Sequence, residues 1–94
     1  MTLGTNAHVR LGEDVLIQQV GEESVLLNLN TEFYFALDEP GTRMIMLLQE
    51  GASVAEAIGK LKETYGVEEA RLLADLSNLV EECQEHGLVQ VTEA

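Results

Sequence analysis

Residues 33–41 have the sequence Phe-Tyr-Phe-Ala-Leu-Asp-Glu-Pro-Gly, and within this stretch the chain changes from strand-forming to helix-forming residues. Phe33–Leu37 is aromatic and apolar, which favours a β-strand. Asp38 can cap a helix with its carboxylate, and Pro40 then falls in the first turn, where its missing N–H leaves no hydrogen bond unmade. The stretch therefore predicts that a strand ends at Leu37 and that a helix begins directly after it.

Two more strands are predicted before this junction. Val15–Val20 and Ser24–Leu29 are rich in Val, Leu and Ile, and a turn at residues 21–23 separates them. A second turn is expected at residues 30–32. Both turns are too short for a crossover connection, so the three strands should form an antiparallel meander. Three short strands are stable only when another element covers one face of their sheet.

The second half of the chain has the spacing of helices. Apolar residues recur at helical intervals within residues 44–48, 54–65 and 72–83. Ser53 and Glu56 make a capping box before the second helix, Gly66 suits its C-terminal end, and residues 88–91 are expected to dock as a short extended segment. The predicted fold class is α+β: a winged helix-turn-helix-like, three-stranded antiparallel sheet followed by three helices. We expect one domain over residues 1–94, with its core at about residues 14–91.

The composition excludes several classes of protein. The formal net charge of −12 repels the phosphate backbone of nucleic acids. The lone Cys83 cannot form an intramolecular disulfide, no apolar run approaches the roughly 18 residues of a membrane helix, and the N-terminus lacks an export signal. We therefore expect a soluble cytoplasmic protein that binds neither nucleic acid nor membrane.

Histidine and cysteine, which often serve as catalytic groups or metal ligands, are few in this chain, and their spacing does not fit a catalytic or metal site. His8 and His86 lie at opposite ends of the chain. The carboxylates near Cys83 would raise the pKa of its thiol rather than activate it. Cys83 and His86 have no further ligand at metal-binding spacing. The sequence predicts no catalytic residues, no metal and no cofactor, and we do not expect an enzyme.

The third predicted strand has the marks of a binding edge. It contains three of the four aromatic residues of the chain, and neither the Lys nor the Pro that usually protects an exposed edge. An open edge of this kind accepts a peptide as an additional strand. The third predicted helix also has a broader apolar stripe than one buried face requires, and the excess is expected to supply pockets for peptide side chains.

The segment Leu27–Arg43 resembles the PqqD family. The pattern Leu-x-Leu-x-Thr-x-x-Tyr-(Tyr/Phe)-x-Leu-Asn-x-x-Gly is usual there, and this chain has Leu-Asn-Leu-Asn-Thr-Glu-Phe-Tyr-Phe-Ala-Leu-Asp-Glu-Pro-Gly. Asp38 replaces the common Asn, and Ile45 stands where a Trp is frequent. The resemblance covers about residues 14–91 and continues, in the family's order, through Leu47–Gly51, Ser53-Val54, Tyr65–Val67, Ala74–Leu76 and Gly87–Val89.

The resemblance implies a function that composition does not show. Members of the PqqD family bind the leader segment of ribosomally made, post-translationally modified peptides, as an added strand between the third strand and the third helix. Carried over by position, the peptide-binding residues on the strand side are Phe33, Tyr34, Phe35 and Ala36, and those on the helix side are Leu72, Asp75, Leu76, Leu79 and Glu82. Asp75 is the expected polar contact, and the acidic balance favours a leader with basic residues.

Several interpretations of the partners remain open at this point. Because the chain ends soon after the third helix, we expect a freestanding element whose modifying enzymes are separate chains. The sequence looks more like the elements of lasso-peptide biosynthesis, with a leader peptidase and a cyclase, than like a chaperone of pyrroloquinoline quinone biosynthesis with a radical-SAM enzyme. A winged-helix transcriptional regulator needs a basic recognition helix, whereas Arg71 is the only cation in the acidic third helix. A dimerisation module is the remaining alternative, and both a monomer and a homodimer fit the sequence.

Overall fold

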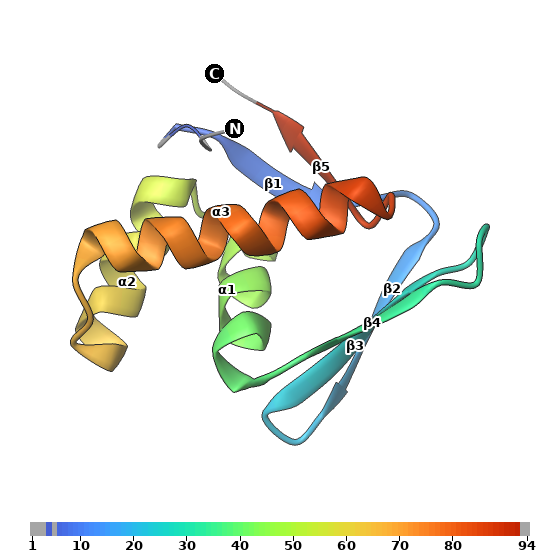
Figure 1. Cartoon of the computed structure of the whole chain (residues 1–94), viewed down its shortest axis with the longest axis horizontal. Helices are drawn as coiled ribbons and strands as arrows, with labels where there is room; N and C mark the ends of the chain where they lie inside the picture. Colours follow the sequence, from blue (N-terminus) through green and yellow to red (C-terminus); the bar gives the residue numbers. More distant parts are fainter. Residues whose placement is uncertain (1–3, 5, 93–94) are drawn as a thin grey trace.

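The computed structural model describes residues 4 and 6–92 of the chain. Its elements, in order, are β1 (His8–Leu11), β2 (Val15–Val20), β3 (Glu23–Asn28), β4 (Tyr34–Leu37), α1 (Glu39–Gln49), α2 (Val54–Tyr65), α3 (Glu69–Glu85) and β5 (Val89–Thr92). The strands form two antiparallel sheets, a three-stranded sheet in the order β2-β3-β4 and a two-stranded ribbon of β1 and β5. The expected α+β fold, with a three-stranded meander followed by three helices, is confirmed (Figure 1).

The β1–β5 ribbon is the part of the fold that local sequence signals do not predict. The segment expected to dock at residues 88–91 is the strand β5, and its partner β1 pairs His8 with Thr92 across almost the whole chain. No turn joins these two strands, so no local sequence pattern predicts that they pair. The predicted domain 1–94 includes residues 1–3, 5, 93 and 94, which lie outside the described part.

The strand-to-helix junction forms as its residues predict. Asp38 is the N-cap of α1, and its Oδ1 accepts a hydrogen bond from the Gly41 N–H at 2.8 Å. Ser53 and Glu56 form the reciprocal capping box of α2. Gly66 ends α2 with φ +65°, a left-handed conformation that residues with a side chain rarely adopt. These caps fix where α1 and α2 begin and where α2 ends.

The register of the meander determines which side chains face the core. Leu26 pairs with Phe35 and Ser24 pairs with Leu37, so these residues share the inner face of the sheet. Leu26 and Leu37 are buried against α1, and the Ser24 hydroxyl hydrogen-bonds that of Thr42 on α1 at 2.7 Å. The helix α1 therefore covers the inner face, which is the cover that three short strands need.

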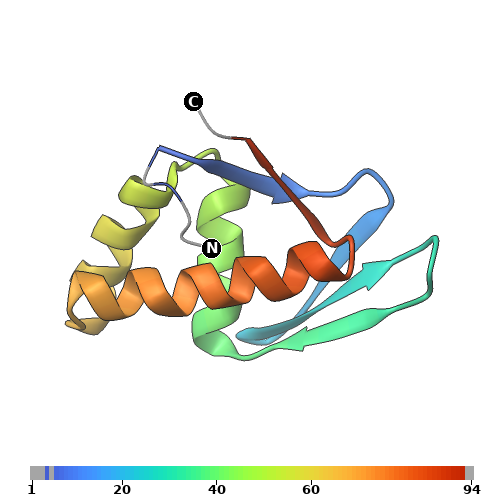
Figure 2. The same ribbon diagram turned by 45° about the horizontal axis from the view of Figure 1, so that its top comes forward.

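The long helix α3 contacts both other helices and two strand elements. It packs against α1 and α2, and its C-terminal end lies beside the β3–β4 hairpin and β5 (Figure 2). Val80, Cys83 and Leu76 on its inner face are fully buried. In the part of the chain that the structure describes, no helix is long and apolar enough to span a membrane.

Candidate functional site

The strand β4 is an edge strand, as the sequence predicts. It pairs with β3 on one side and is the last strand of its sheet. The Asn28 N–H donates to the Phe33 C=O at 2.8 Å, so Phe33 and alternate residues after it direct their backbone groups at β3. Tyr34 and Ala36 therefore direct their N–H and C=O groups at the open edge, where an added strand would pair.

A groove runs along this edge, between β4 and α3. Its volume is about 520 Å³, and we call it the β4–α3 groove; its lining residues are Glu23, Phe35, Ala36, Leu37, Asp38, Gly41, Asn78, Leu79 and Glu82. The apolar residues of the lining are Phe35, Ala36, Leu37 and Leu79, and its three carboxylates belong to Glu23, Asp38 and Glu82. No Lys or Arg lines the groove. An open strand edge beside an apolar surface is suited to an extended peptide, because the backbone supplies hydrogen bonds and the surface buries alternate side chains.

Four of the predicted peptide-binding residues line this groove: Phe35 and Ala36 from β4, and Leu79 and Glu82 from α3. Tyr34 is 71% exposed and faces away from the core, so at the edge it offers its backbone rather than its ring. Phe33 lies beyond the end of the groove, stacked on His86. Asp75 is exposed one helical turn before Leu79 and is not part of the lining.

Two predicted residues of the helix side belong to the core instead. Leu72 is 4% exposed and Leu76 is 0% exposed, and neither lines the β4–α3 groove. A broad apolar stripe in a sequence does not say which of its edges a neighbouring element covers. In the structure α3 packs against α1 and α2, which places Leu72 and Leu76 in the core. We therefore leave both out of the candidate site.

Sequence reasoning missed five residues of the groove: Glu23, Leu37, Asp38, Gly41 and Asn78. The sequence predicts Asp38 only as the cap of the first helix and Glu23 only as part of a turn, and it gives no role to Gly41. Leu37 and Asn78 each follow or precede a predicted site residue, Ala36 and Leu79, and this adjacency is the local signal that could have found them. The other three reach the groove through the pairing of β3 with β4 and the strand-to-helix junction, which are tertiary features.

The single thiol has no part in this site. Cys83 is buried, and burial, with a smaller effect from the nearby Glu82 carboxylate, raises its pKa to about 11. A thiol with this pKa is almost entirely protonated at neutral pH and is a poor nucleophile. Among the described residues, no group of three or more His, Cys, Asp or Glu side chains could hold a metal ion.

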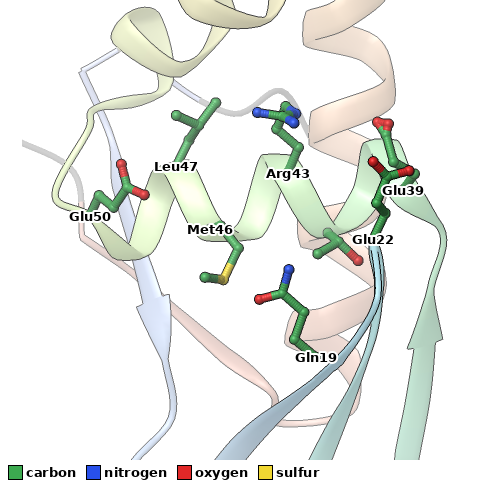
Figure 3. A pocket seen from close by; sticks show the side chains of 8 residues that line it. Gln19, Glu22, Glu39, Arg43, Met46, Leu47 and Glu50 are labelled. Carbon is green, nitrogen blue, oxygen red and sulfur yellow. The ribbon is translucent and has the colours of Figure 1, made fainter.

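A second, smaller hollow lies between the β2–β3 turn and α1 (Figure 3). Its volume is about 230 Å³, and Gln19 and Glu22 face Glu39, Arg43 and other residues of α1 across it. The Tyr65 hydroxyl donates to Glu39 at its border, and burial and this hydrogen bond raise the pKa of Tyr65. The hollow does not touch β4. Its polar lining and smaller volume suit a peptide less well than the β4–α3 groove.

The fold and the groove define an α+β domain of winged-helix-like order, with an open sheet edge beside a helix-lined apolar groove. The chain belongs to the PqqD family: the family model described as Coenzyme PQQ synthesis protein D (PqqD) matches residues 23–89. The matched region begins at β3 and ends in β5, so it contains both walls of the groove. No curated protein matches the chain.

Two solved structures are similar to this chain over most of its length. A structure of TbiB1 in complex with the TbiA(beta) leader peptide is 29% identical, with a TM-score of 0.78, and the match covers 84% of this chain and 93% of that one. A structure of a lasso peptide synthetase B1 complexed with the leader peptide is 25% identical, with a TM-score of 0.81, and the match covers 88% of this chain and 98% of that one. Both of those proteins hold a leader peptide.

Proposed function

We propose that this chain is a non-catalytic adaptor that binds the leader segment of a lasso-peptide precursor and presents the precursor to a separate leader peptidase and cyclase. The observation that carries the proposal is the open β4 edge, bordered by the β4–α3 groove, in a fold shared with two leader-bound proteins. The leader adds to β4 as a further strand, and its alternate side chains enter the groove.

Calorimetric titration with the leader of the precursor peptide encoded beside this protein tests the proposal directly. Saturable one-to-one binding is the expected result. A leader that does not bind leaves the family membership standing and removes the adaptor function. Binding only to the leader of a pyrroloquinoline quinone precursor supports the alternative of a chaperone that works with a radical-SAM enzyme.

A proline in β4 tests strand addition separately from side-chain recognition. The N–H of Ala36 faces the open edge, so Ala36→Pro removes a donor that an added strand needs and spares the ladder to β3. We expect the leader to bind at least about tenfold more weakly, since backbone bonds and edge access are lost together. Isothermal titration calorimetry measures the affinity, and circular dichroism checks the fold.

Ala36→Thr is the matched control for this variant. Threonine enlarges the side chain and is well suited to a strand, but it keeps the backbone N–H. Leader affinity within about threefold of wild type is expected for Ala36→Thr. Equal losses in both variants would assign the effect to the side chain and contradict strand addition.

An adaptor also needs a surface for the enzyme, and the outer face of the sheet is our candidate. Leu16, Leu27 and Tyr34 form one cross-strand row on this face, and Leu16 and Val20 are 55% and 66% exposed. Between Arg10 and Arg43 the chain contains Asp and Glu but no Lys or Arg. Two copies of this acidic segment repel each other, so the charges favour an enzyme with an apolar patch and a basic rim over a homodimer.

Leu16→Gln tests this second surface. We expect it to weaken binding of the leader-loaded protein to the leader peptidase about tenfold, because an exposed apolar contact is lost, and to leave leader affinity unchanged. Surface plasmon resonance with the immobilised peptidase measures the effect. Ala55→Gln, on the exposed side of α2, is the control and should bind the peptidase like wild type. A dimer in sedimentation velocity that Leu16→Gln dissociates would support the dimerisation module instead.

A further inference from the structure

Two stacked rings lie beyond one end of the β4–α3 groove. Phe33 precedes Phe35 by two residues, and His86 follows Glu82 by one turn of α3. Their ring centroids are 3.9 Å apart and their planes differ by 12°. Neither ring is among the residues that line the groove. Along β4 the lining begins at Phe35, two residues after the stacked Phe33, and it extends to Asp38 and Gly41 at the start of α1.

Asn28 holds both members of the stack in place. Its backbone N–H donates to the Phe33 C=O at 2.8 Å, and its side-chain amide lies 3.3 Å from both the His86 and the Gly87 carbonyl oxygens. Asn28 is 7% exposed, and its two side-chain bonds to these carbonyl oxygens are partly buried. Gly87 has φ +67°, and a Cβ at this position would lie 3.2 Å from the Asn28 amide nitrogen. Hydrogen bonds of Asn28 thus link the start of β4 and the C-terminal end of α3 to the end of β3, beside the two rings.

A leader strand added to β4 would extend past Phe35 toward the stacked rings. Its side chains that point inward beside Phe35 and Leu79 enter the groove, but an inward side chain at the level of Phe33 meets the stacked rings. We infer that the Phe33–His86 stack is an end wall that selects leaders with a small residue at this position and fixes their register along β4. The inference rests on the proposed function, because it concerns the same groove.

A tryptophan scan of the leader tests the end wall. Fluorescence anisotropy is measured with labelled leader peptides of the precursor encoded beside this protein, each carrying one Trp substitution. With wild-type protein, one position is expected where Trp lowers affinity at least tenfold through collision with the wall. His86→Ala removes one ring and should recover at least fivefold of that loss at this position alone. Phe33→Leu opens the same wall from the strand side and should recover the same peptide.

His86→Phe is the conservative control, because it replaces one flat ring with another. It should behave as wild type toward every peptide of the scan, and thermal unfolding should show that all three variants are folded. The inference is overturned if His86→Ala changes the affinity of all peptides by the same factor, or if no position is sensitive to Trp. If the wild-type protein does not bind the unsubstituted leader, the proposed function itself is overturned. If it binds that leader but no position is sensitive to Trp, only the end wall is overturned.

Discussion

Leu79→Glu is expected to abolish leader binding while the protein stays folded. Leu79 is half-buried on α3, where it lines the β4–α3 groove opposite Phe35. A carboxylate here lies against the apolar surface that the leader must cover, and it adds to the charge of Glu82 one turn away. Burying that charge under a bound peptide is strongly unfavourable, so we expect affinity to fall at least about 100-fold. Isothermal titration calorimetry measures the loss.

Leu73→Glu is the matched control on the same helix. Leu73 is also half-buried, but it lines the hollow between α2 and α3 rather than the β4–α3 groove. The same substitution there adds the same charge and a similar strain on the core. Leader affinity within about threefold of wild type is expected for Leu73→Glu. If both variants lose binding, or if Leu79→Glu alone loses its circular dichroism spectrum, Leu79 acts through the fold and not through the groove.

Local sequence signals predict most of this fold because particular residue types mark the ends of its helices. Asp38, Ser53 and Gly66 are caps whose side chain or backbone freedom places a helix end within a residue or so. The meander follows from two short turns. What local signals do not provide is pairing across the chain: β1 was not predicted because its partner β5 lies at the other end of the sequence.

The candidate site is predictable on its strand side and less so on its helix side. Alternation along a strand leaves two choices of face, and the register with β3 selects the one that puts Phe35 inward and Tyr34 outward. The broad apolar stripe of α3 has no such two-residue alternation. Only the packing of α3 against α1 and α2 decides which of its apolar residues are buried and which line the groove. Leu76 and Leu79, one turn apart, fall on different sides of that division.

Leu76→Ala is therefore expected to destabilise the protein rather than weaken leader binding. Leu76 is 0% exposed within the core. Removing its side chain leaves a cavity that close-packed neighbours fill only in part, and the free energy of unfolding should fall by about 2–5 kcal/mol. A domain of this size has a total stability of about 5–15 kcal/mol, so the loss is large. Urea denaturation followed by circular dichroism measures it.

Leu79→Ala provides the opposite pattern and completes the argument. Its half-buried side chain contributes less to the core, so its loss of stability should stay near or below about 1.5 kcal/mol, while leader affinity falls about tenfold or more. The folded fraction of Leu76→Ala, by contrast, should bind the leader within about threefold of wild type, because the Leu76 side chain does not reach the groove. A Leu76→Ala protein of normal stability and lost affinity would return Leu76 to the site and require α3 to present a different face to β4.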